Sequence, residues 1–505
     1  MPPGRALLRL VLPDAAAMIA MFAFCWILFT GEGGSRLFRD SDTGWHIRTG
    51  EALLQGAPLP RSDPYSFSRP GAPWVAWEWG ADVLMGLAYQ ADGLRGVALL
   101  FASAGAMAVW LWVRLHWLMG GNFFLACAMA APLVTTMGLH WLARPHVFGW
   151  VLAAGWLYFL ECVPSRRAHF GVALAVAAAV VGTLWANLHA SFFLLPGMAA
   201  VYAAGGWLGR VIWGMPASPG WYVRAGICAA AGTFVNPYGW QLHAHVGQYL
   251  ADSELLKRIG EFQSFNYHAE GAAQILVTVG MATMGATLAL GRGRADHFLL
   301  AGGIALLGIR SARVLPLAAL LALPLINGSL THALRHHSFQ PLPRRLLDAF
   351  LGYSDRLRAL ESRAGGYLSL AAVAALVFVV LHAPAAAARM SFPATEFPVA
   401  AAAAVDNLPA TARLLAPDKF GGYLIYRFNG QRKVFFDGRS DFYGLEFLKR
   451  YIRLMEARPG WRNEVESFGF THALLPVNYS LVAGLTDWGW RELYRDETAI
   501  LLARN

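Results

Sequence analysis

The sequence predicts a multi-span α-helical membrane protein with a small α/β domain at its C-terminus. Of its 505 residues, 56% are hydrophobic and only 14% are charged, and the mean hydropathy is +0.42. A typical soluble domain has about 25% charged residues. The apolar residues occur in long runs rather than in the alternation of half-buried strands. These features exclude a mostly soluble enzyme, and also a disordered chain, which needs low hydrophobicity and high charge.

About eleven apolar segments are candidates for spanning helices, since such a helix needs about 20 mostly apolar residues. Arg310 and Arg313 interrupt two of the later segments, which are the least regular. Arg5 and Arg9 precede the first segment, and no small-residue cleavage site follows it, so we expect an uncleaved signal anchor. The segments lie near residues 11–30, 94–117, 122–142, 147–163, 169–186, 191–213, 222–238, 272–290, 297–309, 314–329 and 366–384.

The basic residues between these segments predict the orientation of the chain. Lys and Arg in short loops mark the cytoplasmic side of a membrane. This rule favours a cytoplasmic N-terminus and an outside C-terminus. The net charge of +10 then reflects topology and contact with anionic lipid headgroups, and it gives no reason to expect a nucleic-acid partner. The inside segments carry Arg5 and Arg9, Arg114, Arg166 and Arg167, Arg210 and Arg224, Arg292 and Arg294, and a basic linker at 331–365.

Two large pieces fall outside the membrane on this topology. Residues 1–384 are expected to form a transmembrane domain whose first outward loop is 31–93, and residues 385–505 an outward domain. In that domain, alternating strand and helix patterns predict a small α/β fold. Strands are predicted at 413–417, 421–428, 432–437, 471–477 and 498–504, and helices at 395–408 and 442–468. The cysteines Cys25, Cys127, Cys162 and Cys228 lie in apolar runs, so buried thiols without disulfides are expected.

Polar residues gather at the predicted outer ends of the spans. Ionisable groups at membrane depth are expensive and usually face a cavity or a site. Their occurrence on one side predicts a shared site at the outer leaflet. The alternative is that they are interfacial anchors and snorkelling side chains. In chain order the candidates are Asp40, Asp42, His46, Glu78, Arg144, His146, Asn187, His189, Asn236, Glu261, Arg310 and Arg313.

The first loop carries several acidic residues with competing interpretations. The amphipathic segment 45–54 predicts a short helix on the membrane surface that holds Asp42 and His46 over the site. Asp42 could instead cap this helix. Asp63 precedes a proline and is more typical of a turn. Glu78 lies between two tryptophans at an interface, where a carboxylate without a partner is unusual.

The outer arginines point to an anion. Arg144, Arg310 and Arg313 lie at helix ends, and arginine offers the planar bidentate donors that suit phosphate. The alternative is that each pairs locally with a carboxylate and joins two spans. In the tail, the DGRSD sequence at 437–441 could bind sugar hydroxyls, or it could form a β-turn with a structural Arg439 ion pair.

These stretches resemble the GT-C membrane glycosyltransferases, and in particular a bacterial group within that class. The resemblance covers most of the chain in layout, but it is specific only in the first loop and the tail. It rests on DTGWHIRTG at 42–50, PRSDPYSF at 60–67, WVAWEW at 74–79, NPYG at 236–239, GGYLIY at 421–426 and FDGRSDFY at 436–443. It implies a polyprenyl-phosphate sugar donor and a bacterial inner membrane. The first-loop acidic residue, here Asp42 with Asp40 second, would be the general base or a metal ligand. A WWD tail motif is absent, which argues against asparagine glycosylation.

The resulting hypothesis is transfer of a sugar from a polyprenyl-phosphate donor to an outward acceptor hydroxyl. Asp42 would be the base, supported by Asp40 or His46, and these three could also hold a divalent metal ion. The three outer arginines would clamp the phosphate. The sugar pocket would be lined by Glu78, His146, Asn187, His189, Asn236 and Glu261. The acceptor could be a lipid, a polysaccharide or a protein. Two alternatives stay open: a transporter or flippase of an anionic lipid or solute, and a non-enzymatic envelope assembly protein.

Overall fold

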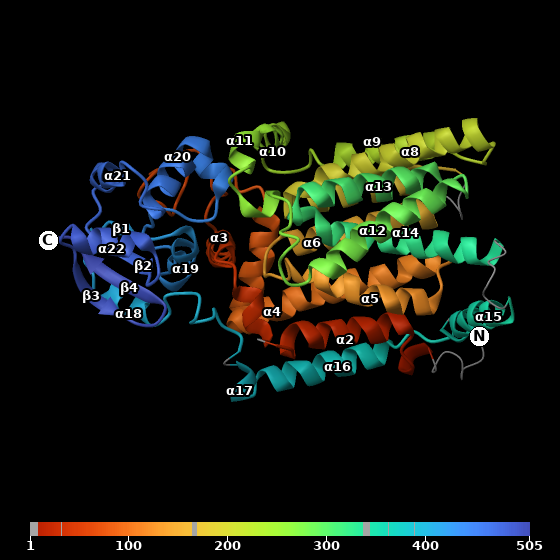
Figure 1. The fold of residues 1–505 in the computed structure, drawn as a ribbon, viewed down its shortest axis with the longest axis horizontal. Coiled ribbons are helices and arrows are strands. Elements are labelled where there is room, and N and C mark those ends of the chain that lie inside the picture. Colours follow the sequence, from red (N-terminus) through yellow and green to blue (C-terminus); the bar gives the residue numbers. More distant parts are fainter. Residues whose placement is uncertain (1–8, 32, 164–168, 337–343, 362, 388) are drawn as a thin grey trace.

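The computed structural model describes residues 9–31, 33–163, 169–336, 344–361, 363–387 and 389–505. Each of the eleven predicted spanning segments overlaps a helix. These helices are α2 (Ala15–Phe29), α4 (Trp79–Leu118), α5 (Phe123–Gly138), α6 (His146–Cys162), α7 (Val172–Leu188), α8 (Leu194–Trp213), α9 (Pro219–Gly232), α12 (Ala272–Leu290), α13 (Ala295–Arg310), α14 (Leu315–His336) and α16 (Tyr367–Leu381). Figure 1 shows most of them lying along the long axis of the molecule, with the C-terminal domain in blue at one end.

The helical bundle confirms the predicted membrane fold. Among the described residues, five helices are long and apolar enough to cross a membrane by length and composition, and four shorter apolar helices accompany them. Such helices are apolar on all sides because lipid replaces water around them, and their backbone groups are satisfied internally. The chain is therefore a membrane protein with several spanning helices. Arg5, Arg166 and Arg167, which contributed to the predicted orientation, lie outside the described residues.

Shorter helices connect the bundle and cover its ends. They are η1 (Gly33–Phe38), α3 (Asp42–Leu54), η2 (Ala190–Phe193), α10 (Trp240–Ala251), α11 (Ser253–Leu256), η3 (Gly260–Phe262), η4 (Ala312–Val314), α15 (Arg344–Glu361) and α17 (Pro384–Ala387). In Figure 1, α3, α10 and α11 lie between the bundle and the C-terminal domain, and α15 lies at the opposite end. The described part of the predicted basic linker is thus largely helical.

The first loop packs tightly on the start of α4. α4 is interrupted by non-helical backbone at Asp92 and Gly93, so its first three turns are separate from the spanning part that begins near residue 94. α3 crosses these turns at two glycines. A Cβ on Gly86 would come within 2.6 Å of the Gly50 carbonyl carbon, and a Cβ on Gly50 would overlap the Asp82 backbone. This close approach of two backbones needs glycine on both helices, and it brings the side chains of α3 against α4.

The C-terminal domain is a mixed α/β unit. Its four strands are β1 (Leu414–Leu415), β2 (His472–Pro476), β3 (Arg491–Arg495) and β4 (Ala499–Ala503), in the order β1-β2-β4-β3. β1 pairs with β2 in parallel, whereas β2 and β3 pair with β4 in antiparallel register. The helices are α18 (Ala401–Asp406), α19 (Asp418–Arg427), α20 (Ser440–Met455), α21 (Trp461–Phe468) and α22 (Ser480–Asp487).

Several details of this domain differ from the sequence prediction. Residues 421–428 are mostly helix α19 rather than a strand, because Gly421 and Gly422 pack their backbone onto Phe436 and Ser41. Residues 432–437 form no strand of the sheet. Instead, Val434 makes an isolated parallel bridge with Ser66 of the first loop. β3 was not predicted, because its exposed residues lack an apolar face.

The cysteines also differ in part from the prediction. All four are free, and Cys162 is buried. Cys25 and Cys228 are half-buried, and Cys127 is exposed on α5, so the expectation of four buried thiols was wrong for these three. In a spanning helix, an exposed apolar position faces lipid rather than water.

Candidate active site

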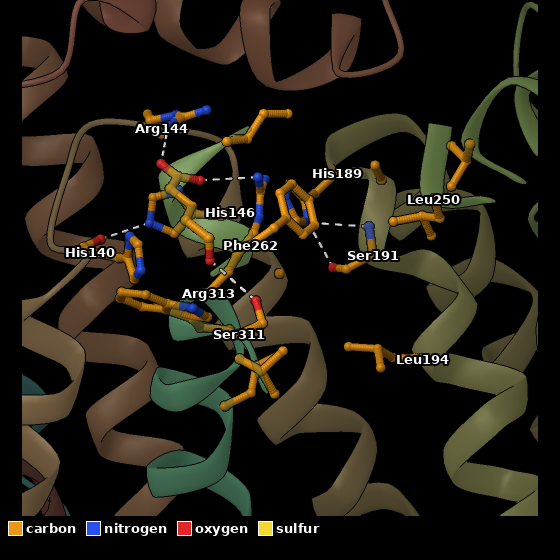
Figure 2. A pocket seen from close by; sticks show the side chains of 18 of the residues that line it. His140, Arg144, His146, His189, Ser191, Leu194, Leu250, Phe262, Ser311 and Arg313 are labelled. Atoms are coloured by element: carbon orange, nitrogen blue, oxygen red, sulfur yellow. Dashed lines mark hydrogen bonds and ion pairs between the residues drawn. The ribbon is translucent and has the colours of Figure 1, made fainter. Parts of the chain in front are cut away.

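One large cavity lies where the bundle meets the first loop and the C-terminal domain. Its volume is about 780 Å³. Figure 2 shows Arg144, His146 and His189 gathered at its polar end, with Leu194 further along the bundle. The apolar wall comes from α8, α13 and α14, and includes Leu194, Met198, Val201, Leu300, Ile304, Leu307, Leu317 and Leu321. From residue 299 to residue 307 this wall extends about 12 Å along α13.

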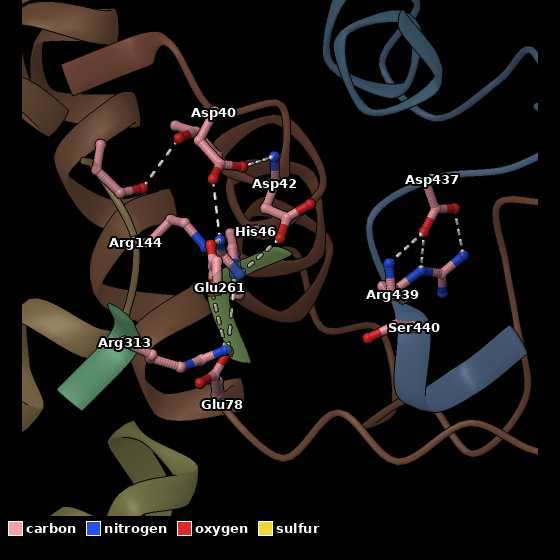
Figure 3. A network of polar contacts seen from close by, with 12 residues as sticks. Asp40, Asp42, His46, Glu78, Arg144, Glu261, Arg313, Asp437, Arg439 and Ser440 are labelled. Atoms are coloured by element: carbon pink, nitrogen blue, oxygen red, sulfur yellow. Dashed lines mark hydrogen bonds and ion pairs between the residues drawn. The ribbon is translucent and has the colours of Figure 1, made fainter. Parts of the chain in front are cut away.

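Arg144 is the centre of the polar end. It lies in the loop between α5 and α6, and its guanidinium contacts three carboxylates (Figure 3). Nη1 is 2.9 Å from Asp40 Oδ2 and 2.8 Å from Glu261 Oε1, and Nη2 is 2.8 Å from Asp42 Oδ2. Glu261 Oε2 also lies 3.0 Å from Arg313 Nη1. The arginines are therefore paired with carboxylates, as the second interpretation of the sequence proposed, while both still line the cavity.

Asp42 lies at the first position of α3, where it faces the cavity. The N-cap position is Ser41, and the Asp42 carboxylate makes no capping bond, so the cap interpretation is not supported. The Asp42 backbone N–H donates to Asp40 Oδ1 at 2.8 Å, which fixes the loop before the helix. Burial raises the pKa of Asp42 to about 8, although Arg144 opposes this effect. The carboxylates of Asp40 and Glu261 add to the rise, because nearby negative charges disfavour ionisation of Asp42.

The pKa of Glu261 is shifted in the opposite direction from that of Asp42. Burial alone would raise the pKa of its carboxyl, but Arg144 and Arg313 together hold that pKa well below its usual range. Glu261 is therefore the permanently ionised partner of the two arginines. The contrast separates the two acids by role: Glu261 neutralises charge, whereas Asp42 can exchange a proton near neutral pH.

A second polar group lies beside Arg144 and is built from two histidines around Glu78. His46 Nδ1 is 2.5 Å from Asp82 Oδ1, and its Nε2 is 3.8 Å from Glu78 Oε2. His189 Nε2 lies 3.5 Å from the other oxygen of Glu78. Burial raises the pKa of Glu78 to about 7, against the opposing charges of Arg144 and Arg313. Burial lowers the pKa values of both histidines well below their usual value.

The C-terminal domain supplies the outer wall of the cavity, through Asp418, Lys419, Gly438, Arg439, Ser440 and Asp441. Arg439 is 2% exposed and is held by two acids, Asp437 and Asp63. The distances are 2.7 Å from Nε to Asp437 Oδ1 and 2.8 Å from Nη2 to Asp63 Oδ1. This geometry supports the structural ion-pair interpretation of the DGRSD segment. Because Asp63 belongs to the first loop, the ion pair also fixes the domain to that loop.

The structure brings most of the predicted site residues together but leaves four away from the cavity lining. Arg310 is exposed at the end of α13. His46 lies behind Glu78 rather than at the cavity surface. Asn187 accepts a bond from Trp79 Nε1 and donates to two carbonyls, and Asn236 bonds within its own turn. The two asparagines thus have structural roles at helix ends. Asp40, Asp42, Glu78, Arg144, His146, His189, Glu261 and Arg313 line the cavity.

Some residues that line the cavity, or lie behind its wall as Asp82 does, were not found from the sequence. Asp82 stands four positions after Glu78, a spacing that puts both on one helix face and could have revealed it. His140 and Ser191 bond the histidines: His146 Nε2 is 2.7 Å from the His140 carbonyl oxygen, and His189 Nδ1 is 2.6 Å from Ser191 Oγ. Lys419 and Asp441 come from the C-terminal domain, and no sequence signal connects them with the first loop.

The three first-loop residues considered as metal ligands pair with other side chains in this structure. The Arg144 guanidinium occupies the space between Asp40 and Asp42, and His46 is turned towards Asp82. Among the described residues, the group with ligand atoms close enough for a metal ion is Glu161, Asp296 and His297. It lies at the α6 and α13 ends away from the polar end of the cavity. Arg294 already bridges its two carboxylates, at 2.6 Å from Glu161 and 2.8 Å from Asp296.

The chain is a polytopic membrane protein with a bundle of spanning helices, a polar loop after the first helix and a mixed α/β domain over the cavity, and two solved structures show that its fold is GT-C-like. Solved structures of this fold are similar to almost the whole chain. ArnT from Cupriavidus metallidurans bound to undecaprenyl phosphate superposes with a TM-score of 0.52 at 12% identity, over 100% of this chain and 98% of ArnT. The oligosaccharyltransferase AglB from Archaeoglobus fulgidus, in complex with an inhibitory peptide and a dolichol-phosphate, gives a TM-score of 0.55 at 10% identity, over 97% of this chain and 74% of AglB. No protein-family model and no curated protein matches the sequence.

Proposed function

We propose that this protein is a membrane glycosyltransferase. It moves a sugar from a polyprenyl-phosphate donor to an acceptor hydroxyl on the outer side of a bacterial inner membrane. The observation that carries the proposal is the cavity, which joins a polar end around Asp42 and Arg144 to an apolar wall on three spanning helices. A lipid phosphate has the same division, with an anionic head and a hydrocarbon chain. The undecaprenyl phosphate of ArnT and the dolichol-phosphate of AglB belong to this ligand class.

In the proposed reaction, the acceptor oxygen attacks the anomeric carbon of the donor. The bond from that carbon to the phosphate oxygen breaks, and the phosphate leaves with the electron pair. Asp42 takes the proton of the attacking hydroxyl as general base. A base with a pKa near the working pH is the most effective, and the pKa of Asp42 is about 8. One attack without a covalent intermediate on the protein predicts inversion at the anomeric carbon.

The leaving phosphate needs a cation, and Arg313 is the better-suited of the two cavity arginines. Arg144 is already shared by three carboxylates, whereas Arg313 has one ion-pair partner among the described residues, Glu261, and is about one-third exposed. A charged donor fixed near a developing charge can stabilise a transition state by several kcal/mol. Lys419, which also lines the cavity, adds a second cation from the C-terminal domain. Arg310, exposed away from the cavity, takes no part in this mechanism.

A flippase or transporter is less well supported. Such proteins bind their substrate near the bilayer midplane, commonly at broken helices in an internal repeat. Here the polar groups gather at the end of the bundle that meets the C-terminal domain, and the deeper cavity wall is apolar. The arrangement supports chemistry at the membrane surface rather than passage of a polar group across it.

The test is donor turnover by purified protein. Polyprenyl-phosphate sugars are offered as a panel with a lipid-extract acceptor, and free polyprenyl phosphate is measured by mass spectrometry. We expect Asp42→Asn to reduce its formation by about 10²- to 10⁴-fold, while co-purifying polyprenyl lipid is retained. Asp487→Asn, at an exposed site on α22, is the control and should retain full turnover. Full turnover by Asp42→Asn would refute the base assignment. Absence of both turnover and polyprenyl lipid in the wild type would refute the function.

A further inference from the structure

Glu78 stands between the cavity and a buried pair of polar residues inside the protein. Its carboxyl lines the cavity. Behind it, His46 and Asp82 are each 1% exposed and lie 2.5 Å apart. Asp82 Oδ2 has no hydrogen-bond partner among the described residues. A buried carboxylate without a cation is costly, so this pair calls for a physical explanation beyond packing.

The contacts of His46 link the two carboxyls through opposite edges of one ring. Nδ1 faces Asp82 Oδ1, and Nε2 faces Glu78 Oε2 at 3.8 Å. The ring itself is held in place by Trp45, whose centroid lies 3.6 Å from the ring centroid of His46. A neutral imidazole carries one N–H and one lone pair, so it donates to one acid while it accepts from the other.

His189 fixes the other side of Glu78. The Ser191 backbone N–H donates to His189 Nδ1 at 3.3 Å, so Nδ1 is an acceptor. The proton of the neutral ring then sits on Nε2, which points at Glu78 Oε1 at 3.5 Å. His189 Nε2 has no hydrogen-bond partner among the described residues, so its N–H faces one oxygen of Glu78 without a formed bond. The second oxygen of Glu78 faces His46 Nε2, whose protonation depends on the proton that Nδ1 shares with Asp82.

We propose that Glu78, His46 and Asp82 form a buried proton relay in which the two carboxyls share one proton through the His46 imidazole. The proton leaves Glu78 Oε2 for His46 Nε2, and the proton on Nδ1 moves to Asp82 Oδ1. The imidazole ends neutral in its other tautomer, and the three groups keep the same total charge. Glu78 thus changes from acid to carboxylate without water entering the protein. The 3.8 Å contact needs to shorten for transfer, as catalytic contacts commonly do when substrate binds.

The relay would control the protonation of Glu78 during the proposed sugar transfer, so its role in the reaction rests on the proposed function. As a carboxylate, Glu78 accepts a hydrogen bond from a sugar or acceptor hydroxyl, and as an acid it donates to a phosphate or sugar oxygen. His46 and Asp82 touch no substrate and are positioning residues. Other groups also act on the charge of Glu78: Arg144, Arg313 and the Ala190 backbone favour its ionised form, and Asp441 opposes it. The charges of these groups are fixed, whereas the relay changes the charge of Glu78 when a proton moves between Glu78 and Asp82.

The test is an infrared titration of purified protein, which needs no activity. The C=O band of protonated Glu78 is identified as the difference between wild type and Glu78→Gln. We expect its midpoint to fall by about one pH unit in Asp82→Asn, because a neighbouring negative charge is removed. His46→Gln, which breaks the link but keeps both carboxyls, should also move the midpoint. Asp92→Asn, a carboxylate further along α4, is the control and should leave it unchanged.

Turnover gives a second, independent readout. If the three residues act as a unit, Glu78→Gln/Asp82→Asn should lose no more kcat than the worse of the two single variants. Multiplicative losses, or a Glu78 midpoint that neither Asp82→Asn nor His46→Gln moves, would overturn the relay. The outcomes separate the two proposals. An unmoved midpoint with an inactive Asp42→Asn would refute the relay alone, whereas a moved midpoint without any sugar transfer would refute only the function.

Discussion

Gly438 of the C-terminal domain lies directly against the carboxylate of Asp42 in the first loop, so close that a Cβ at position 438 would overlap Asp42 Oδ1. Two segments almost 400 residues apart in sequence therefore meet at the proposed base. The contact is rigid on the domain side, because the neighbouring Arg439 is buried between Asp437 and Asp63. A larger side chain at position 438 would therefore displace the Asp42 carboxylate.

Gly438→Ala should displace the Asp42 carboxylate and impair turnover. Overpacking of this kind costs about 1–3 kcal/mol of stability, and a displacement of about 1 Å at a reacting group can cost about 10²-fold in rate. We expect donor turnover to fall by that order while the protein still folds. Gly247→Ala on α10, where a Cβ meets nothing within 4 Å, is the control. Unchanged turnover in Gly438→Ala would show that the contact does not constrain Asp42.

Arg144→Gln should be strongly destabilising. It leaves Asp40, Asp42 and Glu261 without their common cation in a site where Arg144 is only 18% exposed. Breaking a buried ion pair on one side costs about 3–5 kcal/mol. The loss should be larger at pH 8 than at pH 6, since Arg144 favours the ionised acids. Thermal unfolding in detergent measures it, and Arg310→Gln should melt like the wild type. Equal melting of both variants would contradict the central role of Arg144.

Stability should fall as pH rises from about 5 to about 8. The pKa of Asp42 is about 8 against an ordinary 3.8, and that of Glu78 is about 7 against 4.5. A carboxyl with a raised pKa binds more protons in the folded state, so its contribution is complete below the ordinary pKa and is lost as pH rises through the folded one. Asp42→Asn/Glu78→Gln should flatten the melting temperature over this range. Glu261, whose pKa is depressed, works in the opposite direction below pH ~4.5.

The sequence predicted the membrane part of the fold well, because the signal is physical and local. An apolar run of about 20 residues has few alternatives to a spanning helix, and each predicted segment overlaps one. The C-terminal domain was harder. Residues 421–428 have strand-forming side chains, yet they are mostly helical because Gly421 and Gly422 let the helix touch Phe436 and Ser41. That preference is set by tertiary packing, which no local pattern reveals.

The site was predicted in part for a similar reason. Polarity at helix ends identified Asp42, Glu78 and Arg144, which line the cavity. Asn187 and Asn236 gave the same sequence signal, but their amides are used by nearby backbone groups. Distinguishing a site residue from a turn residue requires knowing where its partners lie. The contributions of Lys419 and Gly438 depend on how the C-terminal domain packs against the first loop, which no local sequence pattern indicates.

The apolar wall of the cavity should bind the lipid chain of the donor. Gly303 on α13 lines the cavity, and a Cβ there meets nothing within 4 Å. Gly303→Leu should therefore fit structurally but narrow the cavity, lowering co-purified polyprenyl lipid and raising KM for the donor several-fold. Gly302→Leu, at the next position and with equally open space but away from the cavity lining, is the matched control. If the two variants behave alike in lipid content and KM, the lipid chain lies elsewhere.

The Arg294 guanidinium should occupy the place that a metal ion could take between Glu161, Asp296 and His297, at the end of the bundle away from the C-terminal domain (Figure 1). Its guanidinium bridges Glu161 and Asp296, and His297 Nε2 lies 2.6 Å from Glu161. Removing the side chain in Arg294→Ala would leave two carboxylates and an imidazole with ligand atoms within 4.8 Å of one another, a donor set suited to Zn²⁺. We expect Zn²⁺ to raise the free energy of unfolding of Arg294→Ala by about 2.7 kcal/mol at 100 times its Kd, which is measured as a rise in melting temperature. Wild type and Arg292→Ala should not respond. Stabilisation of the wild type by Zn²⁺ would instead mean that the cluster binds metal with Arg294 present.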